Sequence, residues 1–230
     1  MRFLAALLAF AVATPLVAQT TAAPRLPAAD VNDPQNVWIL DLSTGGRVTI
    51  WLRPDVAPKM VERVRTLTRQ HFYDGLTFHR VIDGFMAQGG DPKGDGTGGS
   101  TLPNVPAEFN YLPHVRGAVS AARADANDSA NSQFFIVFQP KFSLDKKYTV
   151  FGRVIDGMDW VDAVERGEPP TNPSRIVHAY IQADSPPAYQ PGPVASPLAA
   201  QPPALLPTGP KVAAPRPVAK PAPKRAARPR

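Results

Sequence analysis

The stretch FHRVIDGFMAQGGD at residues 78–91 sets three polar side chains, those of His79, Arg80 and Gln88, among apolar neighbours and a glycine pair. These side chains offer hydrogen bonds and, from arginine, a permanent positive charge, but not a strong nucleophile. An arginine in a strand usually faces solvent, and a histidine in such a stretch is usually a satisfied structural group. Each residue alone therefore indicates no function, and a wider set of residues has to be considered.

Several other kinds of reactive site lack support in the sequence. The chain contains no cysteine, which excludes thiol catalysis, disulfides and a lipid-modified cysteine. The four histidines show no metal-binding spacing. No G-x-S-x-G motif indicates serine hydrolysis. The glycine-rich piece GGDPKGDGTGGS at 89–100 has neither the Gly-Lys-Ser/Thr end of a phosphate-binding loop nor the ligand pattern of an EF-hand, so we interpret it as a surface loop.

Two kinds of periodicity predict the elements that would position these residues. WILDL and RVTIWL alternate apolar side chains around a turn, STGG, and predict a hairpin at 38–52. APKMVERVRTLTRQ predicts a helix at 57–70, with Pro58 in its first turn and Met60, Val64 and Leu67 on one face. GMDWVDAVERG predicts a second helix at 157–167, which ends at Gly167. Its apolar side is expected to carry Trp160, Val161 and Val164.

The remaining apolar runs are short and separated by turn residues. They lie at 78–82, 85–88, 117–121, 133–138, 148–154 and 175–183. Many short strands with two helices favour a closed or sandwich-like β architecture over alternating β/α units.

Composition divides the chain into four segments. Residues 1–18 have one positive charge, Arg2, before a short apolar run that Pro15 interrupts, which is typical of a secretory signal peptide. An uncleaved N-terminal anchor is the alternative. Residues 19–35 are interpreted as a linker and 36–184 as a folded domain. Residues 185–230 hold half of the 28 prolines and are expected to be a disordered Pro/Ala-rich tail.

Much of the net charge of +6 comes from the end of the tail, which is basic from residue 211. This end could bind an anionic envelope or membrane surface, although a simply solvated tail is the alternative. Nucleic acid is not an expected partner for an exported protein. The sequence says nothing of oligomeric state, and we take the chain as a monomer. The basic residues are Lys211, Arg216, Lys220, Lys224, Arg225, Arg228 and Arg230.

A set of motifs in a fixed order resembles the cyclophilin family of peptidyl-prolyl isomerases across most of residues 36–184. The motifs are YDGLTFHRVIDGFMAQGGD at 73–91, GTGG at 96–99, EF at 108–109, GAVSAAR at 117–123, NSQFFIVF at 131–138 and FGRVIDGMDWVDAV at 151–164. The resemblance implies a mainly β fold, a closed eight-stranded antiparallel β-barrel capped by two α-helices. It also implies cis–trans isomerisation of X-Pro bonds in proline-containing polypeptides, with no cofactor and no metal.

The resemblance assigns a role to each candidate site residue. Arg80 lies at the position of the family's catalytic arginine, and Gln88 and Gln133 at polar positions that hold the arginine and the substrate carbonyl. Ala122 and Arg123 match the strand edge where substrate backbone would pair. The residues that match the proline socket and its rim are Phe85, Met86, Phe135, Leu144 and Tyr148.

The sequence departs from the family at three places. Ala121 replaces a methionine, which predicts a looser pocket floor. Ser143 stands where relatives carry Trp or Phe, an aromatic that helps bind cyclosporin-class inhibitors, so weak binding of these inhibitors is expected. The loop 124–131 also differs in detail. The alternative function is a non-catalytic peptide-binding or chaperone module on the same barrel. For the isomerase, we expect a role in the folding of exported proteins, in the periplasm by analogy with exported cyclophilins.

Overall fold

The structure, a computed structural model, describes residues 27–189. The predicted signal peptide at 1–18 and all of the predicted tail beyond residue 189 lie outside the described residues. None of the helices within 27–189 is long and apolar enough to cross a membrane.

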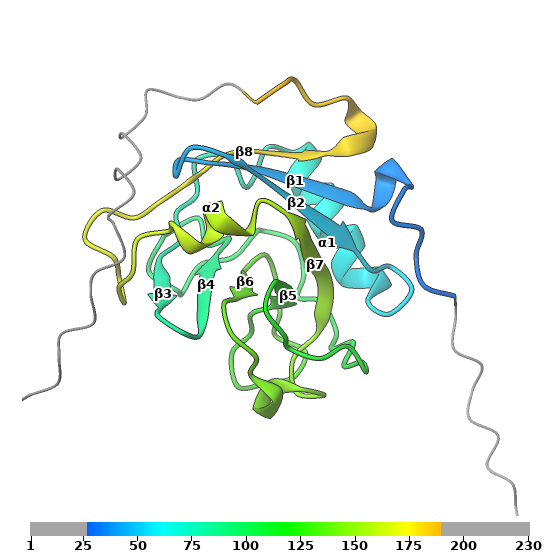
Figure 1. The fold of residues 1–230 in the computed structure, drawn as a ribbon. Helices are drawn as coiled ribbons and strands as arrows, with labels where there is room; N and C mark the ends of the chain where they lie inside the picture. Colours follow the sequence, from blue (N-terminus) through cyan, green and yellow to red (C-terminus); the bar gives the residue numbers. More distant parts are fainter. Residues whose placement is uncertain (1–26, 190–230) are drawn as a thin grey trace, which may run out of the picture. The chain divides into compact units, whose positions relative to one another are not determined.

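Eight antiparallel strands form one curled sheet, in the order β3-β4-β6-β5-β7-β2-β1-β8 (Figure 1). The strands are β1 (Val37–Leu42), β2 (Arg47–Leu52), β3 (Arg80–Ile82), β4 (Met86–Gly89), β5 (Ala118–Ala121), β6 (Phe134–Val137), β7 (Val150–Asp156) and β8 (Ile176–Ile181). The helices are α1 (Pro58–Arg69) and α2 (Met158–Asp162), and three 3₁₀ turns lie at η1 (Pro34–Asn36), η2 (Phe142–Leu144) and η3 (Gln182–Asp184). Each strand expected from the sequence is present, within a few residues of its predicted bounds.

The predicted hairpin and first helix are confirmed. β1 pairs with β2 around the STGG turn, where the Leu42 N–H donates to the Gly46 carbonyl at 2.9 Å. In α1, Met60, Val64 and Leu67 are buried on one face and Pro58 lies in the first turn. The 3.6-residue period of the apolar residues therefore predicted correctly which face of α1 packs on the sheet.

The second helix is shorter than predicted, because α2 ends at Asp162. Gly167 exchanges backbone hydrogen bonds with Val81 of β3, and a continued helix could not bring it there. Val161 is buried as expected, whereas Trp160 is 37% exposed. The indole of Trp160 covers the hairpin turn instead, where a Cβ atom at Gly46 would stand 2.0 Å from Trp160 Cε2.

The predicted closed barrel is seen as an open, curled sheet in which β3 and β8 are the edge strands. These edges do not pair along their length in the described residues. They approach each other at one end, where Thr77 and Arg175 form an isolated bridge.

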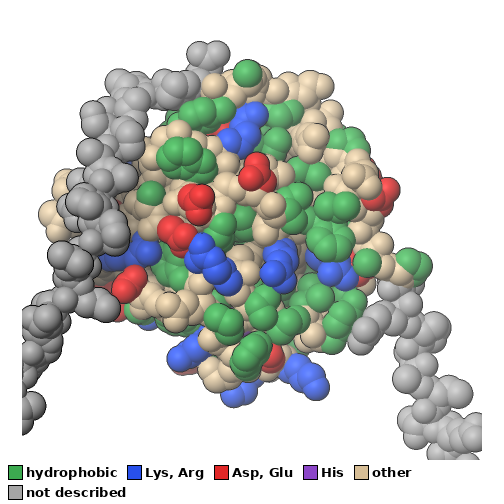
Figure 2. Space-filling model, in the orientation of Figure 1, with side chains coloured by type: hydrophobic (Ala, Val, Ile, Leu, Met, Phe, Trp, Pro, Cys, Tyr) green, Lys and Arg blue, Asp and Glu red, His purple; other side chains and the backbone are tan. Residues whose placement is uncertain are grey.

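The main core fills the inside of the curl with aromatic and aliphatic side chains. Trp38, Phe134 and Phe151 are fully buried, and the Trp38 and Phe134 rings meet edge to face with centroids 5.0 Å apart. Each large apolar side chain buried in this way stabilises the fold by about 1.5–3 kcal/mol. The surface differs: in Figure 2, Lys and Arg side chains lie among Asp, Glu and hydrophobic side chains.

Candidate active site

Strand alternation carries the candidate residues to the outer side of the sheet. Val81 and Ala87 point into the main core, whereas Met86 belongs to a second, smaller apolar cluster. Arg80 and Gln88 are Cα partners across β3 and β4. Since alternate residues share a face of a strand, both emerge on the side of Met86.

β6 follows the same rule. Phe134 and Ile136 enter the main core, while Phe135 and Val137 belong to the second cluster. The run that the sequence presents as uniformly apolar is therefore divided between a core and a binding surface. This division explains how an apolar stretch can carry an arginine and an amide.

A cavity of about 280 Å³ opens on this outer face, and we call it the groove. It brings together every site residue expected from the sequence except Gln133. Its lining residues are Arg80, Phe85, Met86, Gln88, Ala122, Arg123, Phe135, Leu144 and Tyr148. One wall is thus aromatic and aliphatic, and polar groups lie at its edge.

Arg80 lines this groove with its side chain 43% exposed. Its Nε donates to Oε2 of Glu168 at 2.8 Å. The sequence led us to expect that Gln88 holds the arginine, but the Gln88 amide donates to Gln133 Oε1 at 2.9 Å. The residue that contacts the guanidinium in the described chain is therefore Glu168, which the sequence analysis did not identify.

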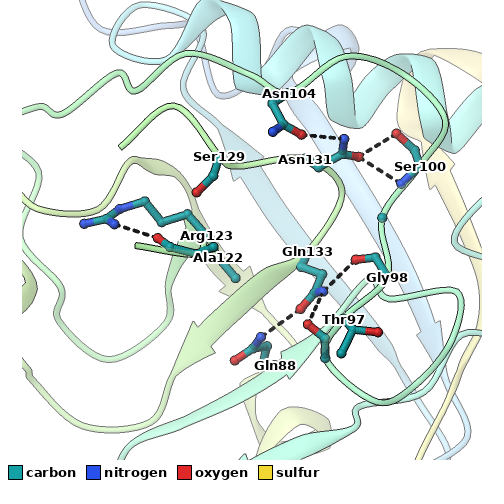
Figure 3. A pocket seen from close by; sticks show the side chains of 13 residues that line it. Gln88, Thr97, Gly98, Ser100, Asn104, Ala122, Arg123, Ser129, Asn131 and Gln133 are labelled. Atoms are coloured by element: carbon teal, nitrogen blue, oxygen red, sulfur yellow. Dashed lines mark hydrogen bonds between the residues drawn. The ribbon is translucent and has the colours of Figure 1, made fainter. Parts of the chain in front are cut away.

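Gln133 lies in a neighbouring cavity of about 400 Å³, which shares Gln88 and Arg123 with the groove. Figure 3 shows the Gln88 and Gln133 side chains pointing toward each other, beside Thr97 and Gly98 of the glycine-rich loop. The Gln133 amide donates to the carbonyls of Gly96, at 3.0 Å, and Gly98, at 2.8 Å. Gln133 thus connects the groove to the loop that the sequence placed at the surface.

Ala122 and Arg123 follow β5 at the rim of the groove. The Ala122 N–H donates to the Gln133 carbonyl at 3.0 Å, so this N–H is already occupied and is not open to a substrate backbone. The Arg123 guanidinium donates to the carbonyls of Ala124, at 2.8 Å, and Lys147, at 3.1 Å. These bonds join two loops across the rim.

The family model described as cyclophilin type peptidyl-prolyl cis-trans isomerase matches residues 39–181. The chain belongs to the cyclophilin family. It is a peptidyl-prolyl cis-trans isomerase, as the names of its relatives also indicate. This finding favours the enzyme over the non-catalytic module considered from the sequence.

Two relatives show the extent of the similarity. The chain is 46% identical over 173 residues to a protein of Brucella suis named "Probable peptidyl-prolyl cis-trans isomerase", covering 68% of this chain and 88% of that protein. It is 42% identical over 128 residues to peptidyl-prolyl cis-trans isomerase B of Bacillus subtilis, covering 55% and 89%.

Solved structures agree with the fold. A cyclophilin from Hirschia baltica matches with a TM-score of 0.62 and 30% identity over 70% of this chain and 78% of that one. A cyclophilin-type isomerase from Cryptosporidium parvum, crystallised in the presence of the dipeptide Ala-Pro, matches with a TM-score of 0.59 and 27% identity over 63% and 98%.

A buried polar network supports the apolar wall of this cyclophilin's groove. His114 is fully buried, its Nδ1 lies 2.8 Å from Oδ1 of Asp145, and its Nε2 lies 3.1 Å from Oγ of Ser120. Burial lowers the pKa of His114, although Asp145 acts in the opposite direction. Burial would raise the pKa of Asp145, but the hydrogen bonds from the backbone and ring of His114 hold it below its ordinary value. The neutral ring therefore donates from Nδ1 to Asp145. The Ser120 hydroxyl has one proton to give, and it lies within reach of both His114 Nε2, at 3.1 Å, and the Thr149 carbonyl, at 3.0 Å.

His79 is the second buried histidine, directly before Arg80. Both of its ring nitrogens are buried, and neither has a hydrogen-bond partner within residues 27–189. Burial lowers the pKa of His79, against the opposite effect of Asp91 and Asp95. This ring is therefore held neutral, and the permanent charge at this end of the groove comes from Arg80.

Two departures from the family can be located. Phe142, adjacent to Ser143, is 62% exposed and does not line the groove, so it does not replace the missing aromatic. Ala121 packs in the main core rather than on the groove, so the looser pocket floor expected from this substitution does not arise at Ala121 itself. Within residues 27–189, no group of three or more His, Asp or Glu side chains is placed to hold a metal ion.

Sequence reasoning missed Glu168 and the network of His114, Asp145 and Ser120. No local pattern distinguishes Glu168 from a surface acid, since its partner lies 88 positions away. His114 had a weak signal, as a histidine shortly before an apolar strand, but its partners come from different loops and strands.

Proposed function

We propose that this isomerase accelerates X-Pro rotation in exported polypeptides, with the groove as its active site and Arg80 as its catalytic residue. One observation carries the site assignment. Arg80 and Gln88, paired across β3 and β4, share a cavity of about 280 Å³ with an apolar wall that includes Phe135 and Leu144. A rigid cation beside an apolar socket is what the reaction needs.

The reaction requires no covalent step. Its barrier is the resonance of the amide, about 18–20 kcal/mol. As the C–N bond turns, resonance is lost and the prolyl nitrogen gains a localised lone pair. A guanidinium N–H aimed at that nitrogen stabilises the twisted state and finds little to bind in the planar one, which is differential stabilisation of the transition state.

The apolar wall of the groove binds the proline ring of the substrate. Phe85, Met86 and Phe135 offer a socket without competing hydrogen bonds. Water excluded from this socket would otherwise screen the charge of Arg80, so its removal strengthens the interaction with the nitrogen. Gln88 donates its amide N–H to Gln133, so its carbonyl oxygen can still accept a hydrogen bond from the substrate.

Replacement of Arg80 tests the assignment. We expect Arg80→Ala to fold normally and to lower kcat/KM by about 10²–10³-fold, the scale of a lost transition-state donor. Exchange of a short X-Pro peptide followed by NMR measures this directly. Arg69→Ala removes an arginine of similar exposure that pairs with Asp184 away from the groove, and it should match the wild type. Near-normal activity of Arg80→Ala would remove Arg80 from the mechanism.

The role in the folding of exported proteins rests on the apolar run at 1–18, and the periplasm is proposed by analogy with exported cyclophilins. Cell fractionation and N-terminal sequencing of the mature protein test both points. Recovery of the full-length chain from the cytoplasm would contradict them.

The basic end of the tail is proposed as a tether to an anionic envelope or membrane surface. Deletion of residues 211–230 should abolish a salt-sensitive association with membrane fractions while leaving X-Pro exchange unchanged. Unchanged fractionation after the deletion would show that the tail is simply solvated.

Two finer structural points complete the proposal. Closure of the barrel is supported by the approach of its two edges, where the Phe78 N–H donates to Ser174 and the Ile176 N–H donates to Leu76, both at 2.9 Å. The chain is proposed to act as a monomer, which light scattering on the purified protein tests.

A further inference from the structure

Within the described residues, the guanidinium of Arg80 makes a hydrogen bond through its Nε atom only. Its Nε donates to Glu168 Oε2 at 2.8 Å, and this is the hydrogen bond that the Arg80 side chain makes within residues 27–189. Within the same residues neither Nη atom makes a hydrogen bond, and Gln88 donates its amide N–H to Gln133 rather than contacting the arginine through a hydrogen bond. The groups that could reach a substrate are therefore the two terminal amino groups of the arginine.

Glu168 reaches Arg80 because Gly167, the residue before it, pairs with Val81 of β3. The Val81 N–H donates to the Gly167 carbonyl at 2.8 Å, and the Gly167 N–H donates to the Val81 carbonyl at 2.9 Å. Gly167 has a φ of +150°, and a Cβ atom there would stand 2.5 Å from the Cα of Pro170. A side chain at Gly167 would therefore displace this segment, and with it the carboxylate beside Arg80.

The ion pair is too exposed to matter much for stability. Its two side chains are 43% and 51% exposed, and pairs of this kind contribute little to folding because solvent screens them. The ion pair matters more for the orientation of the Arg80 guanidinium. A guanidinium is a rigid planar fork, so fixing Nε and the plane also fixes the direction of both terminal amino groups.

We propose that Glu168 is a positioning residue for the isomerisation: it holds Arg80 by Nε and so aims the terminal amino groups into the groove. This inference rests on Arg80 being the catalytic donor. Without Glu168, a half-exposed arginine on an edge strand would sample several rotamers, and only some of them place a donor at the prolyl nitrogen.

Three single variants test the positioning role in the full chain, with X-Pro exchange measured by NMR. Glu168→Ala should lower kcat about tenfold and leave KM within about twofold, as expected for lost orientation rather than lost binding. Glu168→Gln keeps an oxygen that accepts from Nε, and it should recover most of the loss. Glu165→Ala removes an exposed acid of the same loop that has no side-chain partner in the described residues, and it should match the wild type.

A double variant shows whether Glu168 acts through Arg80. Adding Glu168→Ala to Arg80→Ala should cause no further loss of activity, because the group being positioned is already gone. An equal loss in both backgrounds, or a wild-type or raised kcat for Glu168→Ala alone, overturns the inference. Failure of the catalytic assignment itself would be seen separately, as near-normal activity of Arg80→Ala. Circular dichroism of each variant verifies that the fold is retained.

Discussion

The imidazole of His114 is stacked against the ring of Phe135, with ring centroids 6.1 Å apart and planes inclined by 15°. Tyr148 meets the Phe135 ring edge on, with centroids 5.8 Å apart. Phe135 of the groove wall therefore packs on the buried ring of His114, and Tyr148 packs on Phe135. Asp145 and Ser120 hold the His114 ring in place. The shape of the socket depends on a polar network beneath it.

Replacement of His114 should affect both stability and binding. His114→Ala removes the stacked ring and both of its side-chain hydrogen bonds, so we expect the free energy of unfolding to fall by about 1–3 kcal/mol. The KM for an X-Pro peptide should rise because Phe135 loses its support. Urea denaturation and NMR exchange measure the two effects. His178→Ala, at a histidine 53% exposed, should change stability by no more than about 0.5 kcal/mol.

Stability should decrease as the pH falls below about 6.5, the ordinary pKa of histidine. Burial lowers the pKa of both His79 and His114 in the folded chain. The unfolded chain therefore binds protons at a pH where the folded chain does not, and protonation favours unfolding. The loss approaches about 1.4 kcal/mol per pH unit for each proton taken up, and it ends once the folded histidines titrate.

Urea denaturation between pH 8 and pH 5 measures this dependence. His79→Gln removes one of the two groups and should reduce the slope below pH 6.5 relative to the wild type. A free energy of unfolding that stays constant across this range would contradict the assignment of two neutral, buried histidines.

Gln133→Glu should disturb the glycine-rich loop beside the groove. A carboxylate cannot donate to the carbonyls of Gly96 and Gly98, which the Gln133 amide now contacts. The unpaired and repelling oxygens should displace the loop and lower kcat/KM about tenfold, on the scale of a lost hydrogen bond with an unsatisfied partner. Gln139→Glu, an exposed substitution of the same kind, is the matched control. Equal activity of the two variants would show that Gln133 does not shape the site.

Binding of cyclosporin-class inhibitors should be weak and should be restored by Ser143→Trp. Ser143 is exposed in η2, directly before Leu144 of the groove. An indole at this position would add an apolar surface and a hydrogen-bond donor at the rim. Isothermal titration measures the affinity. Phe142→Ala, next to it but outside the groove, should leave the affinity as it is in the wild type; tight binding by the wild-type chain would contradict this view of Ser143.

Much of the fold could be predicted because local patterns reflect local geometry. The spacing of Met60, Val64 and Leu67 is a property of one helix, and it selected the buried face correctly. The short apolar runs likewise located the strands. The length of the second helix was overestimated because its end is decided by the pairing of Gly167 with Val81, a contact that no local preference encodes.

By itself, the sequence determined which residue types stand at which strand positions. The two-residue period of a strand then sends Arg80 and Gln88 to one face and Val81 and Ala87 to the other. The tertiary structure alone decided what meets those faces. Glu168 lies beside Arg80, although 88 positions separate them in the sequence. Asp145 lies beside His114, although 31 positions separate them. Such contacts follow from the order of strands in the sheet and from the loops that return to it, and a local pattern of side chains carries no information about either.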